Sequence, residues 1–222
     1  MRRLVAALVG VALVGAVLGQ TEDVPRMPTW DDEIANGLLP YRQLTAKDFA
    51  VDDNAHPGTG FWIKAFIDPR YRCYMNSANG LIYLYIEKWV VFSGFSQKES
   101  SRKSALKDMN AELPYAQAIL DINELYARQL AALQPGDLPS GHGATLIAAQ
   151  ADLASRIRVF CGETYERVQS ESKELAAATK SGQNKKKVRE LAMAIRKRLN
   201  AVPTPSPASV SPTPSPTASV TH

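Results

Sequence analysis

The stretch from Phe61 to Phe95 alternates runs of β-branched and aromatic residues with turn residues, which is the pattern of β-strands joined by short connections. The predicted strands cover residues 61–67, 71–75 and 81–92. We expect Asp68-Pro69 to end the first strand and Asn79-Gly80 to form a hairpin turn before the third, which bends near Glu87-Lys88. Such a meander has one apolar face that other elements must cover.

Helical spacing begins after Pro114, a residue suited to the first turn of a helix. Apolar side chains then recur three or four residues apart and form one stripe: Tyr115, Ile119, Ile122, Tyr126, Leu130 and Leu133. Pro135-Gly136 is expected to end this helix, and a loop rich in Gly and Pro follows as far as Gly143. The pattern therefore predicts a first long helix directly after the strands.

Two more helices are predicted toward the C-terminus. The longer one has apolar residues on one side at Leu146, Leu153, Ile157, Phe160, Val168 and Leu175, and residues 181–184 end it. The last one is basic and amphipathic, with an apolar side at Val188, Leu191, Ala192, Ile195 and Leu199. Strands first and helices second favour an α+β fold, in which a small antiparallel sheet of about three strands is packed by three or more C-terminal helices.

The N-terminal end differs in composition from this domain. Residues 1–19 combine a basic start with an apolar run, and small residues at Val17 and Gly19 precede a cleavage point, which is the pattern of a secretory signal peptide. An uncleaved N-terminal anchor is the alternative interpretation. Residues 20–43 contain three prolines and are expected to form an extended entry segment, with a single domain over residues 44–200. The protein is therefore expected to be exported, to the periplasm or the extracellular space.

The C-terminal end, residues 201–222, repeats Pro, Ser, Thr, Ala and Val without a charge before His222. A segment of this composition buries too little apolar surface to offset the entropy of ordering it. It is therefore expected to be a disordered tail with local polyproline character, serving as a stalk, a spacer, a glycan carrier or only a solvated end.

Charge narrows the possible partners. Without residues 1–19 the chain has 24 basic and 22 acidic residues, a formal charge of +2 that does not favour nucleic acid. The basic run Lys185, Lys186, Lys187 and Arg189 suggests contact with an anionic surface, although such a run is typical of the solvated face of an amphipathic helix. The pattern indicates no specific partner.

Cys73 and Cys161 are the two cysteines of the chain. In an oxidising compartment such a pair is a candidate disulfide, which would stabilise the fold by about 4 kcal/mol through the long loop that it closes. Two separate buried thiols are the alternative. Because Cys161 lies inside a predicted helix without a nearby His in sequence, a catalytic thiol is not favoured.

The segment from Tyr115 to Arg128 resembles the core helix of a family of predicted bacterial secreted zinc-dependent proteases, catalogued as a domain of unknown function. That helix typically reads His-Glu-Gln-x-His-Phe-Asp-Ile and continues with a sequence like Glu-Leu-Tyr-Ala-Arg. The residues of this chain that match it are Gln117, Asp121, Ile122, Glu124, Leu125, Tyr126, Ala127 and Arg128. The resemblance implies a zincin-like core helix.

Three further segments are similar to the same family. Residues 44–49 resemble its N-terminal Leu-Thr-Trp-x-Asp-Phe element without the Trp, and residues 89–91 resemble its Ser-Trp-Val strand. Residues 176–182 are similar to its Asp-x-x-Thr-x-His-Gly segment and keep Thr179 and Gly182. The likeness runs from about residue 41 to residue 200, nearly the whole predicted domain.

The resemblance also implies where a zinc site would lie. Two His residues four apart on a helix hold zinc, and the Glu between them activates the bound water. The two ligand positions fall on Tyr115 and Ile119, the Glu position on Ala116, and a further His of the family, a candidate third ligand, on Ser181. None of these side chains can do that chemistry, so we expect no zinc and no catalysis here.

The remaining polar residues do not replace this site. His56, beside Asp52 and Asp53, is expected to make local turn and solvent contacts, while His142 lies in a Gly-His-Gly loop and His222 in the tail. We expect Asp121 to be a remnant of the groups around the former zinc, and Glu124 to be a surface charge. The pairs Asp52-Asp53 and Glu171/Glu174 are expected to be solvated.

We therefore interpret the chain as an exported zinc-peptidase-like protein that has lost catalysis and has a binding or structural role. One alternative is an active secreted zinc-dependent protease with unrecognised ligands. The other is an unrelated secreted α+β binding module. If the zinc positions are assigned correctly, Tyr115, Ile119 and Ser181 should converge in space.

Overall fold

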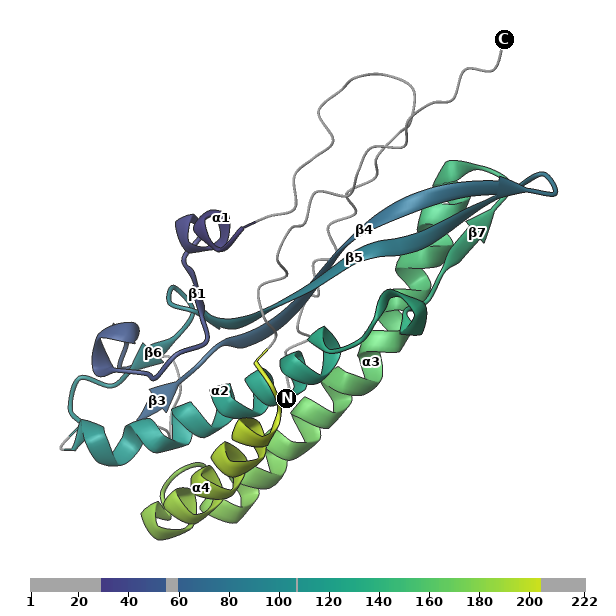
Figure 1. Cartoon of the computed structure of the whole chain (residues 1–222). Helices are drawn as coiled ribbons and strands as arrows, with labels where there is room; N and C mark the ends of the chain where they lie inside the picture. Colours follow the sequence, from purple (N-terminus) through teal and green to yellow (C-terminus); the bar gives the residue numbers. More distant parts are fainter. Residues whose placement is uncertain (1–28, 55–59, 107, 205–222) are drawn as a thin grey trace, which may run out of the picture.

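The computed structural model describes residues 29–54, 60–106 and 108–204, and the predicted signal peptide and all of the tail beyond Thr204 lie outside these ranges. An antiparallel sheet lies on one side of a layer of long helices (Figure 1). The predicted α+β class, with C-terminal helices packed on a small antiparallel sheet, is confirmed.

The sheet is built on one long hairpin of β4 (Ala65–Ala78) and β5 (Leu81–Ser96), which pair along their whole length. The predicted turn is confirmed, because Asn79 and Gly80 have φ angles of 53° and 72°, as a two-residue hairpin turn requires. Glu87 has no partner between the pairs Arg72–Lys88 and Cys73–Ile86, so a bulge lies where the bend was predicted.

The predicted end of a strand at Asp68-Pro69 is wrong, since β4 continues through both residues. Pro69 is tolerated because β4 is the edge strand of the sheet order β1-β5-β4, where a missing N–H leaves no second neighbour unpaired. The start of the same predicted strand belongs to a different, small sheet, in which β6 (Ser101–Arg102) lies between β2 (Ala50–Val51) and β3 (Phe61–Trp62).

The described part of the N-terminal segment is not simply extended, contrary to the prediction for residues 20–43. Residues Trp30–Ala35 form helix α1, whose Trp30 ring packs edge-on against Phe92 at 5.0 Å. Strand β1 (Leu38–Pro40) then pairs with the end of β5. Gly94 makes this pairing possible, because a Cβ there would lie 1.9 Å from the carbonyl oxygen of Leu39. The segment is therefore part of the fold.

Helix α2 (Met109–Ala131) begins five residues before Pro114, so the prediction that this proline occupies the first turn is wrong. The side chain of Asp108 accepts a hydrogen bond from the amide of Ala111 and caps the helix instead. After α2, the Gly/Pro-rich loop contains a short 3₁₀ turn (Pro135–Asp137) and strand β7 (Gly141–Gly143), which pairs with residues 82–84 of β5.

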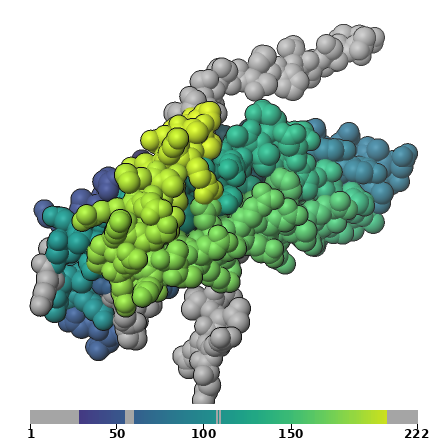
Figure 2. All heavy atoms as spheres, turned by 90° about the horizontal axis from the view of Figure 1, so that it is seen from below, coloured from purple at the N-terminus to yellow at the C-terminus, as the bar shows by residue number. Residues whose placement is uncertain are grey.

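The last two helices agree closely with the predicted pattern. Helix α3 covers Leu146–Thr179 and α4 covers Lys185–Ala201, with the predicted break between them. Lys180, Ser181 and Gly182 all have positive φ angles, which terminates α3. Seen from below, α3 and α4 form most of one face of the molecule (Figure 2).

Helix α2 lies between one part of the sheet and the helices α3 and α4, and it is buried on almost every side, whereas the first part of α3 packs directly on the hairpin and β7. From Ala116 to Leu125 every residue except Ile119 is buried, so the single predicted apolar stripe was too narrow. One cluster joins α2 to α3, α4 and Ile67 of the sheet, and another joins α2 to Leu44, Phe49 and Phe95. A buried helix that also carries polar residues must provide partners for them.

The predicted disulfide is not formed: Cys73 and Cys161 are free thiols. Cys73 on β4 and Cys161 on α3 belong to the same apolar cluster, which also holds Tyr71. Burial raises the pKa of each thiol to about 11. Apolar packing, rather than a covalent link, therefore joins α3 to this part of the hairpin.

Candidate functional site on helix α2

The helix positions assigned to zinc chemistry are filled with packed side chains. Ala116 is 1% exposed and lies in the cluster with Leu120 and Phe95. Tyr115 and Ile119 are half-buried and pack against the neighbouring cluster of α2, α3 and α4. A base at position 116 would have no access to water or substrate. The arrangement on this part of α2 is that of a protein core.

The turn between α3 and α4 meets α2 at Tyr115. A Cβ at Gly182, where φ is +86°, would lie 2.9 Å from Cγ of Tyr115, so the tyrosine ring packs directly on this turn. Ser181 is exposed beside Gly182, and its amide donates to the carbonyl of Ala176. The structure thus brings Tyr115 and the Ser181-Gly182 turn together, while Ile119 lies one helical turn along α2 from Tyr115.

Within the described ranges, no group of three or more His, Cys, Asp and Glu side chains is arranged to hold a metal ion. His142 is exposed and its Nδ1 lies 3.3 Å from Asp152, while His56 and His222 fall outside those ranges. Of the acidic residues near His56 in the sequence, Asp52 accepts from the amide of Asn54, and Asp53 accepts from the amide and hydroxyl of Ser104.

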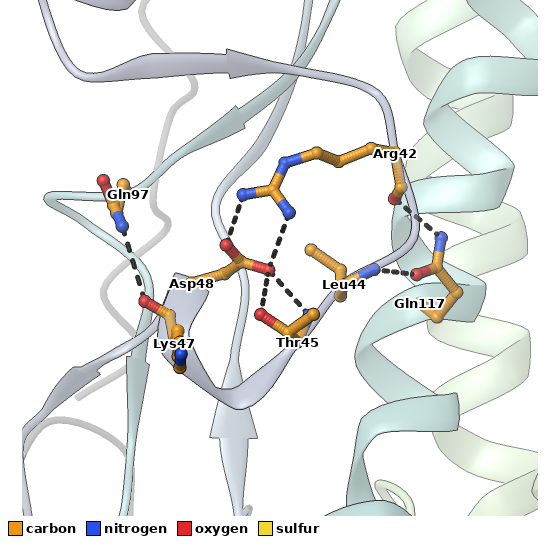
Figure 3. A network of polar contacts seen from close by, with 7 residues as sticks. All are labelled: Arg42, Leu44, Thr45, Lys47, Asp48, Gln97 and Gln117. Carbon is orange, nitrogen blue, oxygen red and sulfur yellow. Dashed lines mark hydrogen bonds and ion pairs between the residues drawn. The ribbon is translucent and has the colours of Figure 1, made fainter.

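Gln117, one of the residues that resemble the protease-family helix, fixes the N-terminal segment to α2 (Figure 3). Its Oε1 accepts a hydrogen bond of 2.7 Å from the amide of Leu44, and its Nε2 donates to the carbonyl of Arg42 at 3.4 Å. Nε2 also donates to Oδ1 of Asp121 at 2.7 Å. Every polar atom of the buried amide is engaged, so Gln117 has a structural role.

The same view shows how the segment that Gln117 holds is shaped (Figure 3). Asp48 accepts hydrogen bonds from the amide and hydroxyl of Thr45, which caps the 3₁₀ turn Ala46–Asp48, and it forms an ion pair with Arg42. Asp48 is 3% exposed. These contacts order the segment that resembles the N-terminal element of the protease family.

Asp121 is the centre of the buried network. Its carboxylate accepts from Nε of Arg196 at 2.8 Å, from the hydroxyl of Tyr41 at 2.9 Å and from Gln117. Burial, and then the charge and hydrogen bond of Asp121, raise the pKa of Tyr41 well above its ordinary value. The hydrogen bonds that Arg196 donates to Asp121 raise the pKa of Arg196. The ion pair links α2 to α4 across 75 residues of sequence.

Glu124 is buried, so its interpretation as a surface charge is wrong. Its carboxylate accepts from Nε of Arg128 at 2.8 Å, one helical turn away. Arg128 in turn lies 5.9 Å from the centre of the Tyr41 ring and donates to the carbonyl of Val202. Helix α2 therefore also positions the end of α4.

Most basic residues of α4 are engaged in ion pairs. Lys185 pairs with Glu112 at 2.5 Å, Lys187 with Glu190 at 2.6 Å, and Arg198 with Glu171. Glu171 also accepts from the hydroxyl of Tyr126, so it is not simply solvated as predicted. The exposed basic residues of α4 with no ion pair in the described structure are Lys186, Arg189 and Lys197. An anionic surface would therefore meet fewer charges than the sequence suggests.

A groove of about 730 Å³ runs between α2 and α4 beside this network. It is lined by Gln43, Leu44, Asn110, Leu113, Pro114, Gln117, Asp121, Ala192, Met193, Arg196, Lys197 and Asn200. Its apolar residues include Met193, which is 69% exposed, and its rim carries the unpaired Lys197. The polar groups that Gln117 and Asp121 contribute to this groove are engaged within the chain.

Comparison of the chain with protein-family models, with curated proteins and with solved structures finds no match. None of the described helices is long and apolar enough to span a membrane.

Proposed function

We propose that this chain is an exported, non-catalytic protein with a zinc-peptidase-like core and a binding role. The observation that carries the proposal is the division of roles on α2. Ala116, Tyr115 and Ile119, which fall on the base and ligand positions of the resembling family, are packed in the interior or against it. The polar residues that match that family, Gln117 and Asp121, are fully engaged in holding neighbouring segments.

Residues 176–182, which are also similar to the protease family, show the same separation between positions with a structural role and positions assigned to zinc chemistry. The hydroxyl of Thr179 donates to the carbonyl of Leu175 and accepts from the amide of Gly182, and Thr179 is fully buried. Gly182 lets the turn approach the ring of Tyr115. Both residues that match the family here have structural reasons, while Ser181, on the His position, is an exposed turn residue. The scaffold is thus accounted for without catalysis.

The groove between α2 and α4 is the surface on which binding is proposed. Leu113, Pro114 and Met193 offer apolar contact, and Lys197 offers an unpaired positive charge. A ligand with an apolar body and a carboxylate or other anionic group would match these features, because burying the apolar part is favourable and the charge of Lys197 is not neutralised within the described chain.

The loss of catalysis is tested by measuring metal content and proteolysis on the purified mature protein, with an unrelated zinc peptidase as positive control. We expect substoichiometric zinc and no casein cleavage that a chelator abolishes. One zinc per chain together with chelator-sensitive cleavage would establish the active protease instead. Bound zinc without cleavage would also contradict the proposal, since it would require ligands that we do not assign.

Export is tested separately by identifying the N-terminus of the protein recovered from the cell. The proposal predicts a mature chain that begins at Gln20 and is found outside the cytoplasm. Recovery of the chain with residues 1–19 intact in the membrane fraction would indicate the uncleaved anchor. Recovery of the intact chain in the cytoplasm would remove the export part of the proposal.

A further inference from the structure

Four aromatic side chains form a row across the free end of the β4–β5 hairpin. Tyr74 lies on β4, Tyr83 and Tyr85 on β5, and His142 on β7. Along the row Tyr74–Tyr85–Tyr83–His142, successive ring centres are 5.3, 6.4 and 6.0 Å apart, and successive ring planes differ by only 23°, 16° and 24°. We call this strip of nearly parallel rings the tyrosine row.

The tyrosine row lies on the face of the sheet opposite α3. Leu84 and Ile86 of β5 are buried in the cluster with α3, and side chains alternate along a strand, so Tyr83 and Tyr85 face the other side. Helix α1 covers this outer face only near the other end of the hairpin (Figure 1). Tyr74 is 52% exposed, the His142 side chain is 48% exposed, and Tyr83 and Tyr85 between them are half-buried. The strip is therefore open to a partner.

Most of the charged side chains around the tyrosine row form ion pairs. Arg72 pairs with Glu87 at 2.9 Å, and Asp152 pairs with Arg156 at 2.9 Å and with His142. In the described structure the hydroxyls of Tyr74, Tyr83 and Tyr85 have no hydrogen-bond partner. The surface thus offers ring faces and hydrogen-bond donors, and Lys88, which lies opposite Arg72 on β5, has no ion pair in the described structure. These features favour a ligand that is rich in acceptors and carries no positive charge.

An extended proline-rich peptide has this chemistry. Proline rings offer apolar surface, and the polyproline II conformation leaves carbonyl groups free to accept hydrogen bonds. Aromatic surfaces bind such segments because their stiffness reduces the entropy lost on binding. Residues 203–222 contain six prolines in two blocks and no acidic or basic residue other than His222. The prolines are Pro203, Pro205, Pro207, Pro212, Pro214 and Pro216.

We propose that the tyrosine row is a docking site for a proline-rich segment, and that its occupant is the chain's own residues 203–222. The point where the segment leaves the fold allows this. The carbonyl of Val202 accepts from Arg128 at 3.3 Å, and two residues further along α2 the carbonyl of Leu130 accepts from the indole of Trp89 on β5. The segment therefore starts beside the C-terminal end of α2, the same end that Trp89 of β5 contacts.

The distance to be spanned is well within the length of the segment. Tyr85 and Tyr83 lie four and six residues from Trp89 along β5, roughly 13 and 20 Å at the rise of a strand. Twenty residues in polyproline II extend to about 62 Å, enough to pass around the sheet and lie along the row. The high effective concentration of a tethered segment favours the chain's own tail over that of a second copy.

The test compares the full mature chain with its Tyr83→Ala and Tyr85→Ala variants by NMR of the tail amides of Val210 and Val220. In the wild type we expect tail signals that are shifted and broadened relative to those of an undocked tail. These signals should not depend on protein concentration. Each substitution should lower the ratio of docked to free tail roughly two- to tenfold, as loss of one aromatic contact predicts. Val159→Ala on α3, where the residue is 73% exposed, removes an exposed apolar side chain elsewhere and should change nothing.

Melting temperatures of the four variants, the double variant Tyr83→Ala/Tyr85→Ala included, establish that each is folded, since none of the altered side chains lies in the buried core. Tail signals identical in the wild type and in the double variant Tyr83→Ala/Tyr85→Ala would overturn the proposal. Signals that shift with protein concentration would assign the row to the tail of a second copy and also overturn it. Perturbation of the row by added chito-oligosaccharide, with an unaffected tail, would identify a glycan site instead.

Discussion

Replacing Asp121 by Asn is the most direct test of the buried network. The substitution keeps the shape of the side chain but removes its charge from the pair with Arg196. Each contact of the Asp121 carboxylate with Tyr41, Gln117 and Arg196 is with a hydrogen-bond donor. An Asn amide must therefore turn its own NH₂ toward one of these donors, which leaves a buried polar group unsatisfied.

The size of the effect follows from the burial of the two partners. Breaking a fully buried ion pair costs about 3–5 kcal/mol. The Asp121 side chain is 2% exposed but that of Arg196 is 38% exposed, so the arginine can recover part of its hydration. We therefore expect a loss of about 2–3 kcal/mol in the free energy of unfolding. For a domain of this size that corresponds to a fall of roughly 5–10 °C in Tm.

Urea unfolding followed by circular dichroism measures this loss. Glu163→Gln is the matched control, because it removes an arginine–carboxylate pair whose Glu163 side chain is 81% exposed, and it should change the free energy by less than about 0.5 kcal/mol. The double variant Asp121→Asn/Arg196→Met should lose less than the sum of the two single variants, because it removes the stranded cation. A loss for Asp121→Asn no larger than for Glu163→Gln would refute the structural role assigned to the network.

Four further predictions test the interior. Ala116→Glu should cost several kcal/mol or prevent folding, because it forces a carboxylate into a position that is 1% exposed; denaturation of the soluble fraction measures it. Gly94→Ala should destabilise the fold by more than about 2 kcal/mol, because its Cβ would collide with the backbone of Leu39. Chemical unfolding measures this loss. Gly136→Ala is the control, because a Cβ at position 136 meets nothing within 4 Å. Burial raises the pKa of Cys73 and Cys161 to about 11, so thiolate forms first in the unfolded chain, and the free energy of unfolding should fall as pH rises from about 9 to about 11. Both thiols should react slowly with a thiol reagent at pH 8 until urea unfolds the chain, without a reductant; two unreactive cysteines in urea would indicate a disulfide instead.

The elements that the sequence predicted well are those whose signals are local. Helices α3 and α4 follow a helical spacing of apolar residues, and the break between them contains residues with positive φ. The turn at Asn79-Gly80 is local in the same sense. In contrast, the continuation of β4 through Pro69 depends on which strand lies at the sheet edge, and that is decided by pairing with a distant segment.

The candidate site was predicted only in part, for a related reason. The positions on α2 that carry no zinc chemistry are visible in the sequence, since Ala116 and Ile119 cannot act as base or ligand under any fold. The partners of Asp121 were not foreseen, because Tyr41 and Arg196 lie 80 and 75 residues away. The available signal was chemical: an Asp on a helix with apolar residues all round must be paired when buried.

A partial motif on a helix is compatible with more than one role. A carboxylate four residues after an amide on one helix, as with Gln117 and Asp121, is compatible with support of a metal site and equally with a structural network. The structure supplies a complete set of partners for both side chains from Tyr41, Leu44 and Arg196. Stability alone is therefore sufficient to explain both side chains. Losing them would cost the fold several hydrogen bonds, whereas the apolar side chains of Ala116 and Ile119 pack α2 against its neighbours, so the proposed loss of catalysis on an intact scaffold is compatible with both observations.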